Sequence, residues 1–175
     1  MYKIYLSPSM QSNSFGINGF GTEEYRMNQI ADAVERKLIG KSNVLVYRSK
    51  RGMNKNEVIE ESNNIKADIH VAIHSNYGAA QGPECFVKVG DETANAVAKE
   101  IYKSLMNIYY DKNIDNGLTY SNEIVEIMSV KASGVLVEIG YHDNIKDVKW
   151  ILENIEQIGE AIADGITLSL ELKKC

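Results

Sequence analysis

The chain has 175 residues, of which 44% are hydrophobic and 25% are charged, and its net charge is −5. These values are typical of one soluble domain with a single hydrophobic core. A negative charge without any block of basic residues argues against a nucleic-acid partner. The sequence also contains no apolar run near the roughly 20 residues that a membrane-spanning helix needs.

The two ends of the chain and its cysteines say little about function. The first eight residues lack the apolar stretch and the small-residue cleavage site of a signal peptide. The chain ends at Lys173-Lys174-Cys175 directly after a helical pattern, so we expect the native polypeptide to continue beyond this point. We expect Cys85 and Cys175 to be free thiols, because two cysteines do not make a disulfide framework.

Predicted strands and helices alternate along the chain. Runs of β-branched residues predict strands at 3–6, 44–47, 68–74, 84–89 and 134–140. Apolar residues at helical spacing predict helices at 22–40, 54–66, 93–110, 143–154 and 155–172. Polar and Gly-containing stretches predict loops at 10–21, 77–83 and 111–122, while 125–131 fits a short helix or a strand. The alternation predicts a single α/β domain, with a twisted, mostly parallel sheet of about six strands and helices on both faces.

Two of the three histidines, His70 and His74, lie in one predicted strand. Four residues of a strand span roughly 13 Å, so these two side chains cannot bind the same metal ion. We interpret His70 as a packed or hydrogen-bonded histidine. His74 ends the strand, and the carboxyl end of a central strand in an open α/β sheet faces the crevice where ligands bind. His74 is therefore a candidate metal ligand, with a hydrogen-bonded core histidine as the alternative.

Glu138 lies inside an apolar strand, where an unpaired carboxylate is costly to bury. It is either half of a buried ion pair, with Lys131 or Arg26, or a general base near a metal-bound water. Its position near the end of a buried parallel strand favours the general base.

Two acids, Glu23 and Glu24, open the first predicted helix behind a capping Thr22, where the helix dipole favours negative charge. They lie about equally far from the centre of the apolar stripe. Helical periodicity therefore cannot choose between them as a possible ligand.

In their order along the chain, these pieces resemble a known family. A Pro-containing turn follows the first strand, an acid opens the first helix, and the chain then carries Ile73-His74-Ser75-Asn76 and Val137-Glu138-Ile139-Gly140-Tyr141. This order resembles the catalytic domain of zinc-dependent N-acetylmuramoyl-L-alanine amidases, the type found in bacterial autolysins and phage endolysins, over essentially the whole chain. Members of this family bind zinc through His, Glu and His. The resemblance implies His74 and Glu24 as ligands, because Glu24 precedes Asn28 by the family's four positions, and it implies Glu138 as the catalytic glutamate.

The first ligand of that family is missing here. Members usually carry a Pro-Gly-His-Gly turn after the first strand, whereas this chain has Met10 where the histidine should fall, and a thioether is a poor zinc ligand. We expect His142 to take its place, because Gly140 and the pair Asp143-Asn144 can turn the chain back over the strand ends. Gln11, through its amide oxygen, is the next candidate. The metal could also be lost, and His142 could have a surface or helix-capping role instead.

The resemblance implies hydrolysis of the amide between the lactyl group of N-acetylmuramic acid and L-alanine of the peptidoglycan stem peptide. Zn²⁺ is the implied cofactor, with Glu138 as the general base. We expect a monomer that acts on the bacterial cell wall, released through a phage-type pore or made as part of a longer protein with a wall-binding module beyond residue 175. Two rival functions remain: a degenerate domain that binds peptidoglycan without cleaving it, and a metallopeptidase that cuts the stem peptide.

Overall fold

A six-stranded sheet forms the centre of the computed structural model, which describes residues 1–172. Its strands are β1 (Tyr2–Pro8), β4 (Val44–Arg48), β5 (Ile69–Asn76), β6 (Glu84–Val87), β7 (Leu118–Tyr120) and β8 (Ser133–Tyr141). Their order across the sheet is β4-β1-β5-β8-β6-β7. All neighbouring strands run parallel except β6 and β8, which are antiparallel. The predicted α/β fold with a mostly parallel sheet is confirmed.

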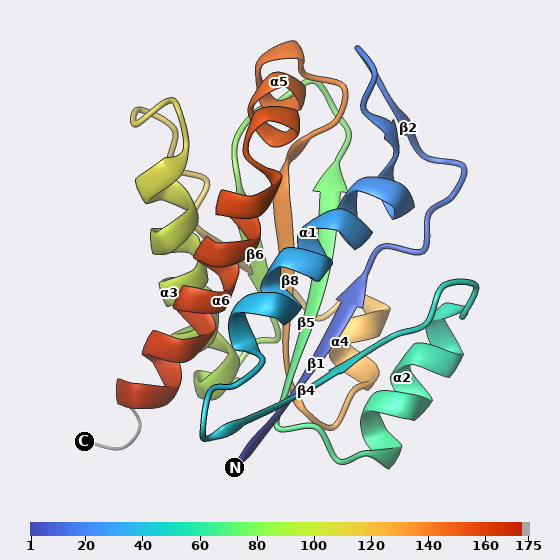
Figure 1. The fold of residues 1–175 in the computed structure, drawn as a ribbon, viewed down its shortest axis with the longest axis vertical. Helices are drawn as coiled ribbons and strands as arrows, with labels where there is room; N and C mark the ends of the chain where they lie inside the picture. The colour runs from blue at the N-terminus through green and yellow to red at the C-terminus, as the bar shows by residue number, and fades with distance from the viewer. Residues whose placement is uncertain (173–175) are drawn as a thin grey trace.

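Helices cover both faces of this sheet. One face, which encloses the main hydrophobic core, carries α1 (Glu23–Leu38), α3 (Glu92–Ile108), α5 (Ile145–Glu153) and α6 (Ile155–Leu172). The opposite face, which we call the polar face, carries only the short α2 (Lys55–Asn64) and α4 (Val125–Ser129) among the described residues. In Figure 1 the arrowheads of β1 and β5 point upward, while α2 and α4 lie toward the lower part of the sheet. The carboxyl ends of the central strands are therefore the part of the polar face that these two helices do not cover.

The first helix begins as its sequence predicts. The side-chain oxygen of Thr22 accepts a hydrogen bond from the backbone N–H of Tyr25 at 3.2 Å, which satisfies one of the unpaired amides of the first turn. The helix ends just before Gly40, whose φ of +88° suits a residue without a side chain. Glu23 and Glu24 are thus the first two helical residues, at the end of α1 that meets the carboxyl ends of the strands.

The structure adds strands within two stretches predicted as loops. The predicted loop 10–21 contains β2 (Phe15–Gly16), which pairs with β3 (Gly21–Thr22), and the predicted loop 111–122 contains β7. Both are too short for a period of two to be visible in the sequence, and they exist through pairing with a neighbour. The ambiguous stretch 125–131 contains the helix α4.

Two smaller expectations concern the cysteines and the membrane. Cys85 is buried and free, as predicted, whereas Cys175 lies outside the described residues. Across residues 1–172, no helix has both the length and the apolar character needed to cross a membrane.

Candidate active site

His74 lies at the carboxyl end of β5 with its side chain on the polar face. Along this strand Ile69, Val71 and Ile73 enter the main core. Because side chains alternate along a strand, His70, Ala72 and His74 point to the other side. The His74 side chain is 13% exposed, and its Nε2 atom is shielded from solvent without a hydrogen-bond partner among the described residues. His74 is thus an imidazole with one ring nitrogen free to accept a ligand.

The other ring nitrogen of His74 meets the first residue of α1. Nδ1 lies 2.9 Å from Glu23 Oε1, and the same oxygen accepts the backbone N–H of Ser75 at 3.3 Å. Because an ionised carboxylate only accepts hydrogen bonds, the hydrogen of this contact belongs to Nδ1. Glu23 is 1% exposed, and the Ser9 hydroxyl also donates to it.

The charges of this pair stabilise each other. Burial alone would raise the pKa of Glu23, but the hydrogen bond from His74 and the attraction to its ring outweigh it and lower the pKa below its ordinary value. Burial alone would lower the pKa of His74, but the contact with Glu23 outweighs it and raises the pKa. Each side chain therefore favours the charged form of the other.

Glu138 lies next to His74 on the neighbouring strand. The two residues are partners in the register of β5 and β8, so their side chains share the polar face. Glu138 is partly exposed, yet its Oε2 atom is buried and has no partner among residues 1–172. Burial raises the pKa of Glu138 to about 7, the attraction of His74 opposes this rise, and the carboxylates of Glu23 and Glu84 add to it. A carboxylate with this pKa can take up and release a proton near neutral pH.

The ion pair that the sequence allowed for Glu138 is not formed. Arg26 donates instead to the backbone oxygens of Phe20 and Gly19, and Lys131 makes no contact with Glu138 within the described part of the chain. An unpaired buried polar atom costs about 1–3 kcal/mol, so Glu138 Oε2 and His74 Nε2 call for a ligand or water.

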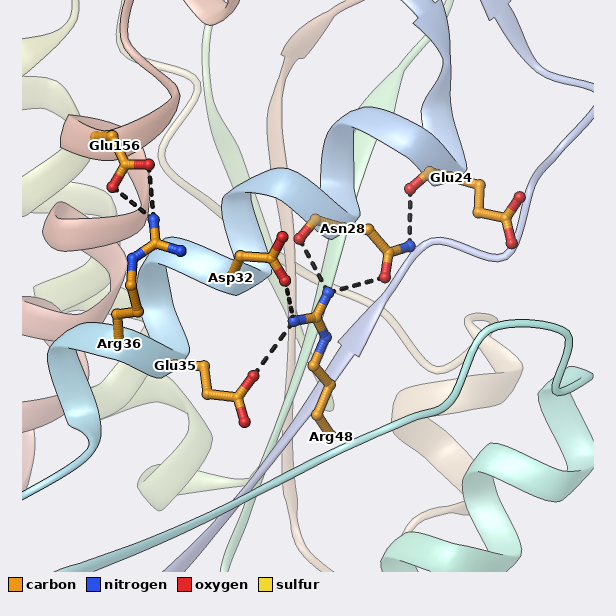
Figure 2. A network of polar contacts seen from close by, with 7 residues as sticks. All are labelled: Glu24, Asn28, Asp32, Glu35, Arg36, Arg48 and Glu156. Atoms are coloured by element: carbon orange, nitrogen blue, oxygen red, sulfur yellow. Dashed lines mark hydrogen bonds and ion pairs between the residues drawn. The ribbon is translucent and has the colours of Figure 1, made fainter.

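The structure does not bring Glu24 to His74. Consecutive residues of a helix point about 100° apart, so only one of the two acids can face His74, and that residue is Glu23. Glu24 lines a small pocket with Pro8 and Met10 instead. In Figure 2 its carboxylate points away from the polar contacts of its own helix. A ligand role for Glu24 stays a prediction.

The start of α1 is tied to the end of β4, as Figure 2 shows. Arg48 donates to the backbone oxygen of Asn28 at 2.9 Å and to its side-chain oxygen at 2.8 Å, and Asn28 donates to the backbone oxygen of Glu24 at 2.8 Å. Arg48 also pairs with Asp32 and Glu35. These contacts hold the first turn of α1, and with it Glu23, against the strand ends.

His142 folds back over the strand ends, as its sequence context predicts, but on the other side of β5. Its Nδ1 lies 2.9 Å from the Ser75 hydroxyl and its Nε2 lies 3.3 Å from the Ser14 hydroxyl. The ring is 2% exposed and packs against Phe20 and Tyr77. Both of its nitrogens are thus occupied by hydroxyl groups, and the structure does not bring His142 together with His74.

The position after β1 offers no strong third donor. Met10 lies beside Glu24, and Gln11 is exposed, with its backbone N–H bonded to the Ser9 hydroxyl at 3.2 Å. Among residues 1–172, no group of three His, Cys, Asp or Glu side chains is arranged to hold a metal ion. His74 and Glu23 supply two donors of the kind that zinc prefers, and the hydroxyl of Ser9 is the next polar group beside them.

Sequence reasoning missed Glu84, which lies opposite Glu138 in the antiparallel pair of β6 and β8. Its strand has four residues, and the alternation within them is weak. The only signal available was an acid at the start of a β-rich run.

These features define a hydrolytic class of α/β enzyme: a buried histidine–carboxylate pair beside a glutamate that can exchange a proton, at the carboxyl ends of parallel strands. The chain belongs to the N-acetylmuramoyl-L-alanine amidase family, whose family model matches residues 4–168. Members of this family cleave peptidoglycan, and the chain is accordingly a peptidoglycan amidase that acts on the cell wall. The family is generally zinc-dependent.

Solved structures show the same fold. The catalytic domain of CwlV, an amidase from Bacillus (Paenibacillus) polymyxa var. colistinus, is 23% identical, with a TM-score of 0.84 over 98% of this chain and 99% of that one. An amidase from Clostridium difficile 630 is 20% identical, with a TM-score of 0.87 over 98% of each chain. The catalytic domain of the CD27L endolysin, which targets C. difficile, is 17% identical, with a TM-score of 0.71 over 96% of this chain and 98% of that one. No curated protein matches the chain.

Proposed function

We propose that His74 and Glu23 hold the zinc ion of this amidase and that Glu138 is its general base. The observation that carries this proposal is the 2.9 Å contact between His74 Nδ1 and Glu23 Oε1, beside the unpartnered buried Oε2 atom of Glu138 on the neighbouring strand. An imidazole nitrogen and a carboxylate oxygen are both ordinary zinc ligands. Zinc, when bound, supplies a positive charge that polarises the scissile carbonyl and makes water more acidic.

The substrate of this site is the amide between the lactyl group of N-acetylmuramic acid and L-alanine of the stem peptide. Glu138 takes one proton from the attacking water and passes it to the nitrogen of the leaving L-alanine. Its pKa of about 7 suits both halves of this transfer, because the group is neither fully protonated nor a very weak base at neutral pH.

Glu23 takes the ligand role in this proposal because it contacts His74, and Glu24 and His142 are the residues that compete for it. His142 would have to give up its bond to Ser75 or its bond to Ser14 before that nitrogen could bind the same ion. We further propose that the whole chain forms one catalytic domain that acts as a monomer, which light scattering of the purified protein tests.

Zinc content and reaction products test the residue roles. We expect His74→Ala and Glu23→Gln to lose bound zinc, while Glu24→Gln and Glu138→Gln keep it. Glu138→Gln should lower the rate of wall hydrolysis by about 10²- to 10⁴-fold, the usual contribution of a general base. If Glu23→Gln kept all its zinc while Glu24→Gln or His142→Ala lost it, the residue whose variant lost zinc would be the ligand instead of Glu23.

Mass spectrometry of digested cell walls identifies the bond that is cut. We expect free lactyl carboxylates together with new N-terminal L-alanine. New termini within the stem peptide would instead show a peptidase, and intact walls with a zinc-loaded protein would contradict the assigned base.

A further inference from the structure

Glu84 is a second carboxylate beside the proposed general base. It begins β6 as the direct partner of Glu138 in an antiparallel pair, where the Cβ atoms of opposed residues lie about 4.5–5.5 Å apart on the same face. Its neighbours in sequence confirm the direction: Cys85 and Val87 enter the main core, and Phe86 packs on the polar face. Glu84 therefore shares the polar face with Glu138 and His74.

Two like charges directly opposite each other destabilise a sheet, so this arrangement needs a reason. No Lys, Arg or His side chain in residues 1–172 forms an ion pair with Glu84, and its contact is a neutral one, from the Thr119 hydroxyl to Oε1 at 2.5 Å. This bond holds the carboxylate of Glu84 at the strand end without neutralising it. The row from His74 through Glu138 to Glu84 thus carries an excess of negative charge on its Glu84 side.

The order of this row matches the polarity of a scissile amide. Neighbouring strands lie about 5 Å apart, so Glu138 sits between His74 on one side and Glu84 on the other. The proposed function places the carbonyl group on the His74 side, where the cation would be held. The amide nitrogen then lies on the side of Glu84, where a carboxylate can accept its N–H.

We propose that Glu84 contacts the substrate, accepting the N–H of the scissile amide and then binding the ammonium group of the released stem peptide. This inference rests on the proposed function of His74 and Glu138. During hydrolysis the water oxygen bonds to the carbonyl carbon, the C–N bond breaks, and Glu138 delivers the proton to nitrogen. The free amine then takes a further proton from solvent at neutral pH, and Glu84 neither forms nor breaks a covalent bond.

The test compares two peptides as inhibitors of cell-wall hydrolysis by the full chain. One is a stem peptide with a free N-terminal L-alanine, and the other is the same peptide with its amine acetylated. A charge-assisted hydrogen bond predicts that the free-amine peptide inhibits the wild type at least about tenfold more strongly than the acetylated peptide does. Glu84→Gln, which keeps the shape and can still accept from Thr119, should remove this preference and lower kcat/KM.

A matched control and a measurement on the wild type complete the experiment. Glu123→Gln removes an exposed acid just after β7 and should keep the preference. In the wild type, the preference should also disappear at pH 9, where the α-amino group, with a pKa of about 7.7–8.0, is neutral. This second measurement tests whether the charge of the ammonium group is recognised, and it does not depend on the folding of Glu84→Gln.

Equal inhibition by the two peptides in the wild type, including no inhibition by either, would overturn the assignment. So would a preference that survives in Glu84→Gln. Failure of the proposed function is a separate result, since it would show as unchanged zinc content in His74→Ala and unchanged activity in Glu138→Gln.

Discussion

The buried network around His70 should govern the stability of the fold and leave metal binding intact. His70 is fully buried, with Nε2 at 2.9 Å from Glu126 Oε1 and Nδ1 at 3.0 Å from the Ser62 hydroxyl. Its ring stacks on Tyr5 at a centroid distance of 5.2 Å. Glu126 belongs to α4 and Ser62 to α2, so this one imidazole joins both short helices to the sheet.

The size of the effect follows from what His70→Ala leaves behind. Glu126 is 3% exposed and would keep only the hydroxyl of Ser7, at 2.6 Å, as a partner. Removing the partner of a buried carboxylate leaves an uncompensated charge, which costs about 3–5 kcal/mol. For a domain of this size each kcal/mol lowers the melting temperature by about 2–4 °C, so we expect a fall of about 6–20 °C.

Thermal unfolding and zinc content, measured on the same samples, check this prediction. The double variant His70→Leu with Glu126→Leu removes both polar partners together and should recover much of the lost stability, because no carboxylate then stays buried alone. A loss below about 1 kcal/mol in His70→Ala would refute the reasoning. Loss of zinc from the folded variant would refute it equally, since it would place His70 at the metal.

Gly165→Ala should push α6 away from α3, because a Cβ at this position would lie 2.5 Å from the Cα of Ile101. We expect the free energy of unfolding in denaturant to fall by about 1–3 kcal/mol, and an unchanged unfolding midpoint would contradict this. Burial would raise the pKa of Glu126, but the hydrogen bond to His70 outweighs this effect and lowers the pKa below the ordinary 4.5. The ionised Glu126 therefore stabilises the fold above pH 4.5, and this contribution is lost as the pH falls through the lowered pKa of Glu126. Glu126→Gln should therefore show a shallower fall in unfolding free energy below pH 4.5 than the wild type, and equal slopes would count against the assignment. Asp147 is fully buried and accepts the backbone N–H of Gly82 at 2.8 Å, so Asp147→Asn should speed hydrogen exchange at that amide, and unchanged protection would show that the loop is held by other contacts.

The parts of the fold that the sequence predicts well are those set by local pattern. The strands at 68–74 and 134–140 are buried runs of β-branched residues, and the structure places β5 and β8 within about two residues of them. The short strand β7 has only three residues and no apolar period, so nothing local distinguishes it from a loop. It exists because β6 offers it a pairing edge.

The residues of the candidate site likewise fall into those that local sequence pattern predicts and those that depend on tertiary contacts. His74 and Glu138 could be singled out because each is a polar residue near the end of a buried strand. The preference for Glu23 over Glu24 depends on how α1 is rotated against β5, which is a tertiary property that two adjacent helical positions cannot reveal. Glu84 stayed hidden for a related reason: its importance comes from its register with a strand far along the chain.

The strand order also decides when during folding the site can exist. β8 is the last strand in the chain, yet it lies between β5 and β6 at the middle of the sheet. Until it inserts, β5 and β6 have no common neighbour, and His74 and Glu84 belong to two separate pieces of sheet. Pairing across such long sequence separations is slow, so the row of His74, Glu138 and Glu84 should be among the last features to form. A partly synthesised chain would then carry His74 for some time before it could harm any cell wall.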